Sequence, residues 1–330
     1  MGDRALIDGR SGGVSRAALA ALGAIALAAA ASIALPAPLL AHVGRPPEPH
    51  DLWTMWRPPL VTLAALVLLG AAYARGLRAL RRRAGAGRVV SSARARCFAG
   101  GLAAIAIAVA SPLDLMSAAL FSAHMVQHLL LVLVAGPLLA LGRAELVLLW
   151  ALPLRGRRMV ARAWRGAPWL RAATGWLVLP AAAWLLHTIA LWAWHLPRAY
   201  DAATRSEALH VLEHASFVVT AVLFARPLVV RGARAAATLA PGAALLYLFA
   251  SAMQSGVLGA LLALAGFPWY ASHLTTTAPW GLTPIEDQQI AGVLMWGPAG
   301  GAYLAAMLWA MRRWLADAEI AGLGLRARSE

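Results

Sequence analysis

The sequence predicts an all-α fold: a polytopic bundle of about seven transmembrane helices that follows an N-terminal signal or anchor segment. Three observations predict it. Of the 330 residues, 61% are hydrophobic and 13% are charged, a balance that does not suit a water-soluble surface of this size. The apolar residues form runs of about 20, long enough to cross ~30 Å of hydrocarbon as a helix. Arginines collect in the connections between these runs.

Residues 1–41 are predicted to be a signal peptide or an N-terminal anchor helix. Three arginines precede an apolar run from Ala17 to Leu35, and the small residue Ala41 follows. This order is typical of a secretory signal. Because the run is also long enough to stay in the bilayer, cleavage and retention both remain open.

Residues 42–315 are predicted to form a seven-helix transmembrane domain, and residues 316–330 a cytoplasmic tail. A β-barrel is excluded, because its strands would be about half as long and would alternate in polarity. The predicted spans are 58–79, 97–113, 116–141, 174–196, 208–230, 238–265 and 288–311.

The arginines predict how the chain is oriented in a bacterial plasma membrane. All 29 basic residues are arginine, and against 14 acidic residues they give a net charge of +15. Their dense blocks follow alternate spans, at 75–96, 143–171, 226–234 and 312–328. The positive-inside rule assigns these blocks and the C-terminus to the cytoplasm. Arginines placed between apolar runs indicate the lipid bilayer as partner and no nucleic acid.

Two connecting segments differ from simple loops. Residues 155–171 combine regularly spaced arginines with two tryptophans, which predicts an amphipathic helix on the inner membrane surface. Residues 266–286 form a long, aromatic, proline-punctuated outer loop. We expect this loop to cover the outer end of the bundle.

Polar residues inside the spans carry the functional prediction, because the bilayer penalises them. Six histidines lie in or at the edge of the spans, all in the outer half or near the mid-plane. Two pairs have i, i+4 spacing, so each pair projects from one helical face and can hold an ion between its rings. The six are His124, His128, His187, His195, His210 and His214.

Other polar residues occur at similar depth. Met253 and Asp287 are further candidate ligands, and Asp114 and Glu213 are acidic groups expected to orient the imidazoles. Imidazole combined with thioether and carboxylate suits copper, as Cu(I), and suits zinc or iron less well. The sequence therefore predicts a copper site in the outer half of the bundle.

Several separate segments resemble the CtaG-like cytochrome c oxidase assembly factors, the multi-span family linked to haem–copper oxidases. The resemblance covers roughly residues 50–312. Its motifs are SAHMVQHLLLVLVAGPLLALG (122–142), WAWHLPRAYDAATRSEALHVLEHASF (192–217), MQSGVLGALLALAGFPWY (253–270) and TPIEDQQIAGVLMWGPAG (283–300).

The resemblance implies a non-enzymatic metallochaperone that supplies copper to cytochrome c oxidase subunits at the outer face. His187 and Met253 are predicted as ligands from their depth in the membrane rather than from the resemblance. Gln288 is expected to lie beside the ligands. The ligands carried over from the motifs are His124, His128, His195, His210, His214 and Asp287.

Two other functions remain open on the residues alone. Two histidines from facing spans could serve as axial ligands of a haem, as in a membrane cytochrome. Alternatively, histidines with Asp287 could bind zinc and activate water for an intramembrane hydrolase. The sequence has no H-E-x-x-H motif, which argues against the hydrolase.

Overall fold

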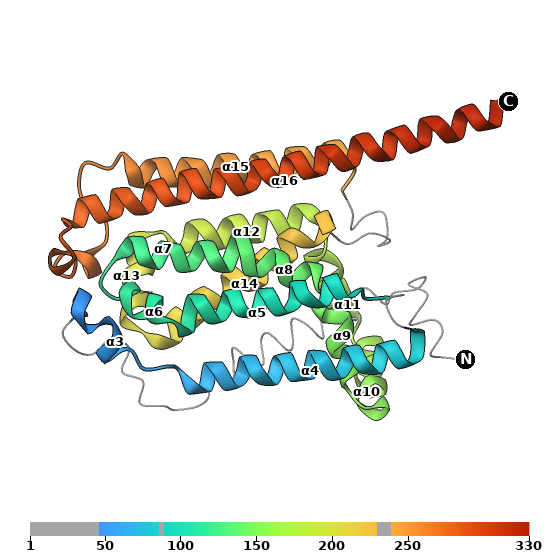
Figure 1. Cartoon of the computed structure of the whole chain (residues 1–330), viewed down its shortest axis with the longest axis horizontal. Helices are drawn as coiled ribbons and strands as arrows, with labels where there is room; N and C mark the ends of the chain where they lie inside the picture. The colour runs from blue at the N-terminus through green and yellow to red at the C-terminus, as the bar shows by residue number, and fades with distance from the viewer. Residues whose placement is uncertain (1–45, 86–88, 230–238, 330) are drawn as a thin grey trace.

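The computed structural model describes residues 46–85, 89–229 and 239–329, with side chains up to residue 319. Within these ranges the regular structure is helical, and the long helices lie side by side along one axis (Figure 1). The predicted all-α bundle is confirmed. The predicted leader, 1–41, lies outside the described residues.

Six helical segments of the described chain are long and apolar enough to cross a membrane, and a seventh span is possible as a bent pair. Five of the six are single helices, and the sixth, Phe121–Leu141, is composite. The single helices are α4 (Leu60–Ala84), α5 (Ser92–Ala110), α14 (Glu207–Val229), α15 (Pro241–Ala263) and α16 (Pro284–Ser329).

The composite span contains a π-helical turn, Leu130–Ala135, between α7 (Phe121–Leu129) and α8 (Gly136–Leu141). Pro137 lies at the start of α8 and has no N–H to donate to the preceding turn. A wider turn accommodates the missing hydrogen bond and the proline ring without ending the helix.

The fourth predicted span, 174–196, is broken rather than continuous. It consists of α11 (Pro168–Leu177) and α12 (Pro180–Trp194), which meet at 76°. Leu179 has an extended backbone, as the residue before a proline prefers, and Pro180 then occupies the first turn of α12.

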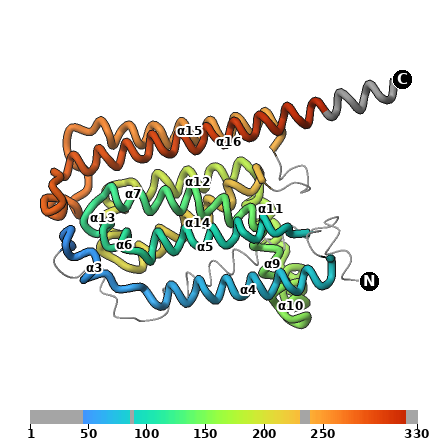
Figure 2. Tube along the Cα trace, viewed as in Figure 1, coloured from blue at the N-terminus to red at the C-terminus, as the bar shows by residue number. Residues whose placement is uncertain are grey.

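Close helix contacts fix the position of the composite span. A Cβ atom on Gly136 would overlap Ala221 of α14, so glycine allows α8 and α14 to approach closely. The last two long helices, α15 and α16, run side by side as a hairpin (Figure 2). Gly259 and Gly292 lie at their contact, where neither has room for a side chain.

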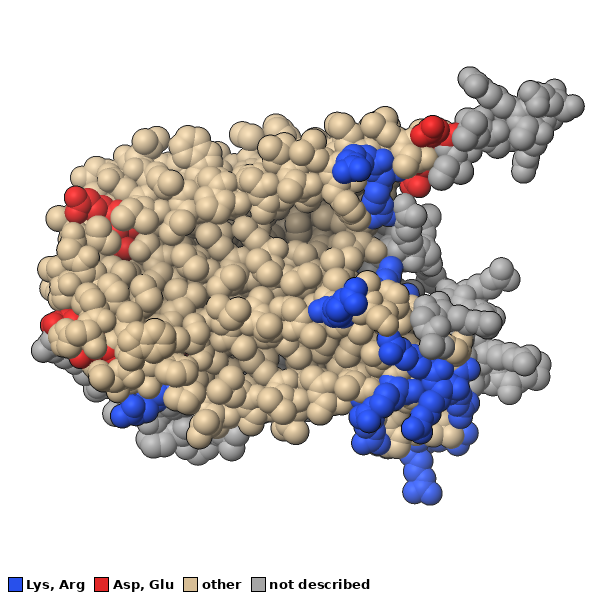
Figure 3. Space-filling view, viewed as in Figure 1, with Lys and Arg blue, Asp and Glu red and all other residues tan. Residues whose placement is uncertain are grey.

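The two ends of the bundle differ in charge. Arginines gather at the end that carries α9 (Ala144–Ala151) and α10 (Leu154–Gly166), while acidic residues dominate the other end (Figure 3). The arginine-rich segment predicted to be amphipathic is helical as α10, and its Trp164 is buried. These two ends are called the arginine end and the acidic end below.

The loop between α15 and α16 folds over the acidic end and is called the cover loop (264–283). It contains two short 3-10 helices, η4 (Ala271–His273) and η5 (Ala278–Trp280). Beside it lie α6 (Pro112–Ser117) and α13 (Pro197–Arg205), as Figure 1 shows.

Candidate metal centre

Two helices supply the principal side chains of the site. His124 and His128 lie one turn apart on α7, and Glu213 and His214 lie in the second turn of α14. The i, i+4 spacing turns both α7 histidines toward α14. The close approach at Gly136, farther along the same span, brings these two faces together.

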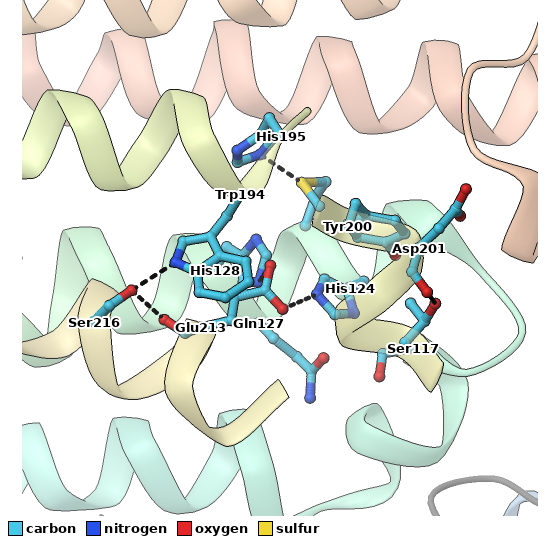
Figure 4. Close-up of polar contacts among 12 residues, drawn as sticks. Ser117, His124, Gln127, His128, Trp194, His195, Tyr200, Asp201, Glu213 and Ser216 are labelled. Carbon is cyan, nitrogen blue, oxygen red and sulfur yellow. Dashed lines mark hydrogen bonds and ion pairs between the residues drawn. The ribbon is translucent and has the colours of Figure 1, made fainter. Parts of the chain in front are cut away.

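The four side chains converge within the protein. One ligand atom from each of His124, His128, Glu213 and His214 lies within 4.8 Å of the others. The Glu213 carboxylate bridges the two α7 histidines: its Oε2 is 3.6 Å from His124 Nε2 and its Oε1 is 3.4 Å from His128 Nε2. Figure 4 shows Glu213 between these two rings. We call these four residues the His/Glu cluster.

Several polar atoms of the cluster are buried without a hydrogen-bond partner among the described residues. They are both ring nitrogens of His128, both carboxylate oxygens of Glu213 and Nε2 of His214. Buried polar atoms that lack a hydrogen bond are costly and rare in folded proteins. A bound cation would satisfy them, and three imidazoles with one carboxylate form a suitable transition-metal donor set.

His210 completes a wider group of stacked imidazoles. Its ring centroid lies 4.3 Å from that of His214 and 5.4 Å from that of His124. His210 is only partly buried, unlike the cluster residues. It therefore occupies the more accessible side of the site, one helical turn before His214.

Comparison with known proteins identifies the family. Residues 71–317 match the family model described as the cytochrome c oxidase caa3 assembly factor. The chain belongs to this family. The matched segment contains the whole His/Glu cluster, and the resemblance predicted from the sequence motifs is confirmed. The protein is accordingly a multi-pass membrane protein of an oxidase assembly family.

Two similar curated proteins are longer and uncharacterised. Uncharacterized protein Mb0105 of Mycobacterium bovis (strain ATCC BAA-935 / AF2122/97) is 28% identical over 260 residues. Uncharacterized protein MT0111 of Mycobacterium tuberculosis (strain CDC 1551 / Oshkosh) matches equally well. In both cases the alignment covers 76% of this chain but only 38% of the relative. No solved structure matches the chain.

Two other predicted histidines of this protein, His187 and His195, lie beside the His/Glu cluster rather than in it. His195, directly after α12, hydrogen-bonds the Leu191 carbonyl through Nδ1 and contacts the Met125 sulfur through Nε2. His187, two turns earlier, contacts the Thr220 hydroxyl at 3.1 Å. The two rings face a small cavity that also borders His128.

Met253 and Asp287 do not reach the cluster. Met253 is 51% exposed, on the side of α15 that faces away from the bundle. The prediction failed because the depth of a residue along a helix does not determine the face on which it lies. The Asp287 carboxylate instead accepts hydrogen bonds from the backbone N–H groups of Phe121 and Ser122, at 2.6 and 3.1 Å. The two carboxylate oxygens of Asp287 therefore cap the N-terminus of α7, as the side chain of an N-cap residue does in other helices.

The residues predicted to support the ligands have separate roles. Gln288 accepts a hydrogen bond from the Trp269 backbone at 2.7 Å and thereby anchors the cover loop. The Asp114 carboxylate accepts a hydrogen bond at 3.0 Å from the side chain of Gln127, the residue before His128. Glu213, expected only to orient imidazoles, contributes its carboxylate to the cluster itself.

Three residues that were not predicted from the sequence complete the surroundings of the cluster. The Tyr200 ring packs edge-on against His124, and its hydroxyl lies 2.8 Å from His273 Nε2. Burial lowers the pKa of His273, in the cover loop, to about 4, so this imidazole is neutral at neutral pH. The third residue is Met125, which lies between the two α7 histidines in sequence. Met125 precedes His128 by three residues, and this spacing could have predicted that the two side chains lie on the same side of the helix.

Asp201 and Tyr270 fasten the cover loop over this group. The Asp201 carboxylate accepts from the backbone N–H groups of Ala271 and Ser272, at 3.3 and 3.0 Å. The Tyr270 hydroxyl donates to the His195 carbonyl at 2.9 Å. These bonds hold the cover loop against the end of the bundle that bears the histidines.

Proposed function

We propose that this protein is a copper-binding membrane assembly factor that holds Cu(I) in the His/Glu cluster and supplies it to cytochrome c oxidase subunits. The observation that carries the proposal is the convergence of four ligand atoms within 4.8 Å in a buried site. The caa3 oxidase assembly family supports oxidase subunits as the partner. In this proposal the protein carries metal rather than catalysing a reaction.

The membrane orientation belongs to the same proposal. Arginines gather at the end opposite the cover loop (Figure 3), and the positive-inside rule would place that end and the C-terminus in the cytoplasm. The cluster then lies toward the outer face, in the first turns of α7 and α14. A client domain on the outer side of a bacterial plasma membrane would meet it there.

The geometry favours a small ion over the two alternatives. The His124 and His128 ring centroids are 4.4 Å apart, and those of His128 and His214 are 5.4 Å apart. Rings in such contact leave no gap for a porphyrin between them. A hydrolytic zinc site needs an open coordination position for water, whereas the four cluster side chains are buried together.

Metal analysis of the purified protein tests the proposal. We expect about one copper in the cluster after anaerobic Cu(I) loading, and its loss in the His124→Ala/His128→Ala double variant. Glu213→Gln should weaken copper binding at least about tenfold against a Cu(I) chelator, since it replaces a charged ligand by a neutral isostere. His50→Ala is the matched control, because the His50 side chain is 72% exposed and is not among the four cluster residues.

The same variants should be tested for oxidase assembly in cells lacking the wild-type chain. The double variant should fail to restore the copper-loaded oxidase, while His50→Ala should restore it. A metal-free wild-type protein, together with a double variant that supports normal assembly, would overturn the proposal. Stoichiometric zinc in place of copper would favour the hydrolase.

A further inference from the structure

A small cavity between α7, α12 and α16 adjoins the His/Glu cluster. It has room for about one water-sized species, and its lining includes Met125, His128, His187, His195 and Met295. We propose that this cavity is a second metal site, selective for Cu(I), with Met125 Sδ and His195 Nε2 as its ligands. The inference deepens the proposed copper function and rests on it for its physiological role.

The contact between His195 and Met125 is the first observation. His195 Nδ1 lies 2.6 Å from the Leu191 carbonyl oxygen, which can only accept a hydrogen bond, so Nδ1 carries the proton. In the neutral imidazole Nε2 then presents a lone pair, and it lies 3.3 Å from the Met125 sulfur. A thioether sulfur is likewise an acceptor. Two acceptors therefore face each other, a contact that a cation between them would make favourable.

The same hydrogen bond is the usual support of a metal-binding histidine. Ligating imidazoles donate their second ring N–H to a carbonyl or carboxylate, which fixes the tautomer and the ring orientation. A charged imidazolium would offer another solution, but burying it without a carboxylate is costly. His195 is 3% exposed, and its side chain contacts Leu191, Met125 and the rings of His128 and Phe217.

The separation suits coordination. With metal–nitrogen and metal–sulfur bonds of about 2.0 and 2.3 Å, atoms 3.3 Å apart subtend about 100° at the ion, between trigonal and square geometry and close to tetrahedral. The two ligands would need no large movement. Their positions are fixed by packing, because Met125 is fully buried in the same core cluster as Met295.

His187 supplies a second, independent observation. His187 Nδ1 lies 3.1 Å from the Thr220 hydroxyl, whose own proton can go to the Ser216 carbonyl at 2.8 Å. In the tautomer in which Nδ1 donates to this hydroxyl, His187 Nε2 presents a lone pair, and Nε2 has no hydrogen-bond partner among the described residues. This buried lone pair borders the same cavity as Met125 and Met295.

Sulfur distinguishes this site from the His/Glu cluster. Thioether ligands select Cu(I) over zinc, magnesium and calcium, whereas imidazole and carboxylate alone discriminate less. His128 lies between the two sites, with its ring centroid 5.8 Å from that of His195 and 5.4 Å from that of His214. An ion in the sulfur site would thus have His128 as its next available ligand on the way to Glu213.

X-ray absorption at the copper edge tests the sulfur site in the full chain loaded anaerobically with Cu(I). We expect two coppers per wild-type chain and a clear sulfur scatterer. Met125→Leu/Met295→Leu, which preserves apolar volume, should reduce two coppers to one and abolish the sulfur signal. Met253→Leu is the matched control, since this methionine is half exposed away from the cavity, and it should change neither quantity.

A selenomethionine-substituted wild-type chain provides a measurement that does not depend on the folding of a variant. Copper in the proposed site should then show a selenium scatterer in place of sulfur. One copper per chain with only nitrogen and oxygen scatterers would overturn the sulfur site and leave the proposed function standing. Loss of one copper in Glu213→Gln, with the sulfur signal retained, would support two separate sites. A wild-type chain that binds no copper would overturn both.

Discussion

The Asp287 carboxylate at the start of α16 accepts a 2.6 Å hydrogen bond from the backbone N–H of Phe121 at the start of α7. The two residues are 166 positions apart in the chain. This bond holds the first turn of α7, and hence His124, against the hairpin formed by α15 and α16. Asp287 thus supports the site from outside without touching its ligands.

Removing this cap should weaken the bundle but leave the metal ligands in place. Asp287→Ala deprives two buried N–H groups of their acceptor, and we expect a loss of about 1–3 kcal/mol. Asp287→Asn retains one acceptor oxygen and should cost less. Thermal unfolding midpoints in detergent would measure both effects. If Asp287→Asn lost its copper while remaining as stable as wild type, Asp287 would be a ligand rather than a cap.

Stability should depend on pH through Asp114, which lies in α6 between two spans. Burial raises the pKa of its carboxyl to about 7, although the hydrogen bond from Gln127 opposes the shift. The unfolded carboxyl ionises near pH 4 while the folded one retains its proton. The folded state therefore loses stability as pH rises from about 4 to about 7, and the loss is complete above that range.

The Asp114→Asn variant should remove this component. Its amide oxygen can still accept from Gln127, and it does not titrate. We expect the variant to unfold at a higher temperature than wild type at pH 8, with the difference shrinking toward pH 5. Melting curves of both proteins across pH 4.5–8 would measure it. A difference that is constant over that range would contradict the raised pKa.

Releasing Asp201 should loosen the cover loop. Asp201→Ala leaves the Ala271 and Ser272 amides without the carboxylate that now accepts from them. We expect faster proteolysis within the cover loop and faster exchange of copper with an external chelator. Asp201→Asn, which keeps one acceptor, should have an intermediate effect. Equal proteolysis of the wild-type and Asp201→Ala proteins would show that these bonds do not hold the loop closed.

The buried ion pair between Arg226 and Glu145 should matter for stability at the arginine end. Its closest N–O distance is 3.6 Å, and both residues are buried. Arg226→Met leaves an uncompensated carboxylate and should cost about 3–5 kcal/mol. Adding Glu145→Leu should restore most of the loss, as a double-mutant cycle of unfolding free energies would show. Additive losses would indicate that the pair is not coupled.

The spans could be predicted because their length and apolarity are local properties of the sequence. The break at Pro180 was harder to predict, because a proline inside an apolar run kinks some membrane helices and ends others. Here the extended backbone of Leu179 turns α11 by 76° from α12. That direction depends on packing against neighbouring helices rather than on the residues of the span.

The two histidine pairs were predictable from i, i+4 spacing, which assigns residues to one face of a helix. Which faces meet is a tertiary property, and it decided the rest of the site. Met253 was predicted from its depth alone, and it lies on the side of α15 that faces away from the bundle. Met125 has the same thioether sulfur, and its side chain contacts His195 inside the bundle. Glu213 was expected to orient an imidazole, but the rotation of α14 turns its carboxylate into the cluster.

The break at Pro180 has a consequence for the lipid around the protein. With 15 residues at 1.5 Å each, α12 is about 22 Å long, some 8 Å short of an average hydrocarbon layer. Its Leu185 and Ile189 are exposed on the outside of the bundle. Where α12 alone crosses the hydrocarbon layer, the lipid acyl chains along this flank would have to compress or tilt to match it, a hydrophobic mismatch that costs free energy in thick bilayers. Bilayer thickness would therefore act on the helix that positions His187 and His195, and acyl-chain length becomes a variable to control when copper binding is measured in reconstituted membranes.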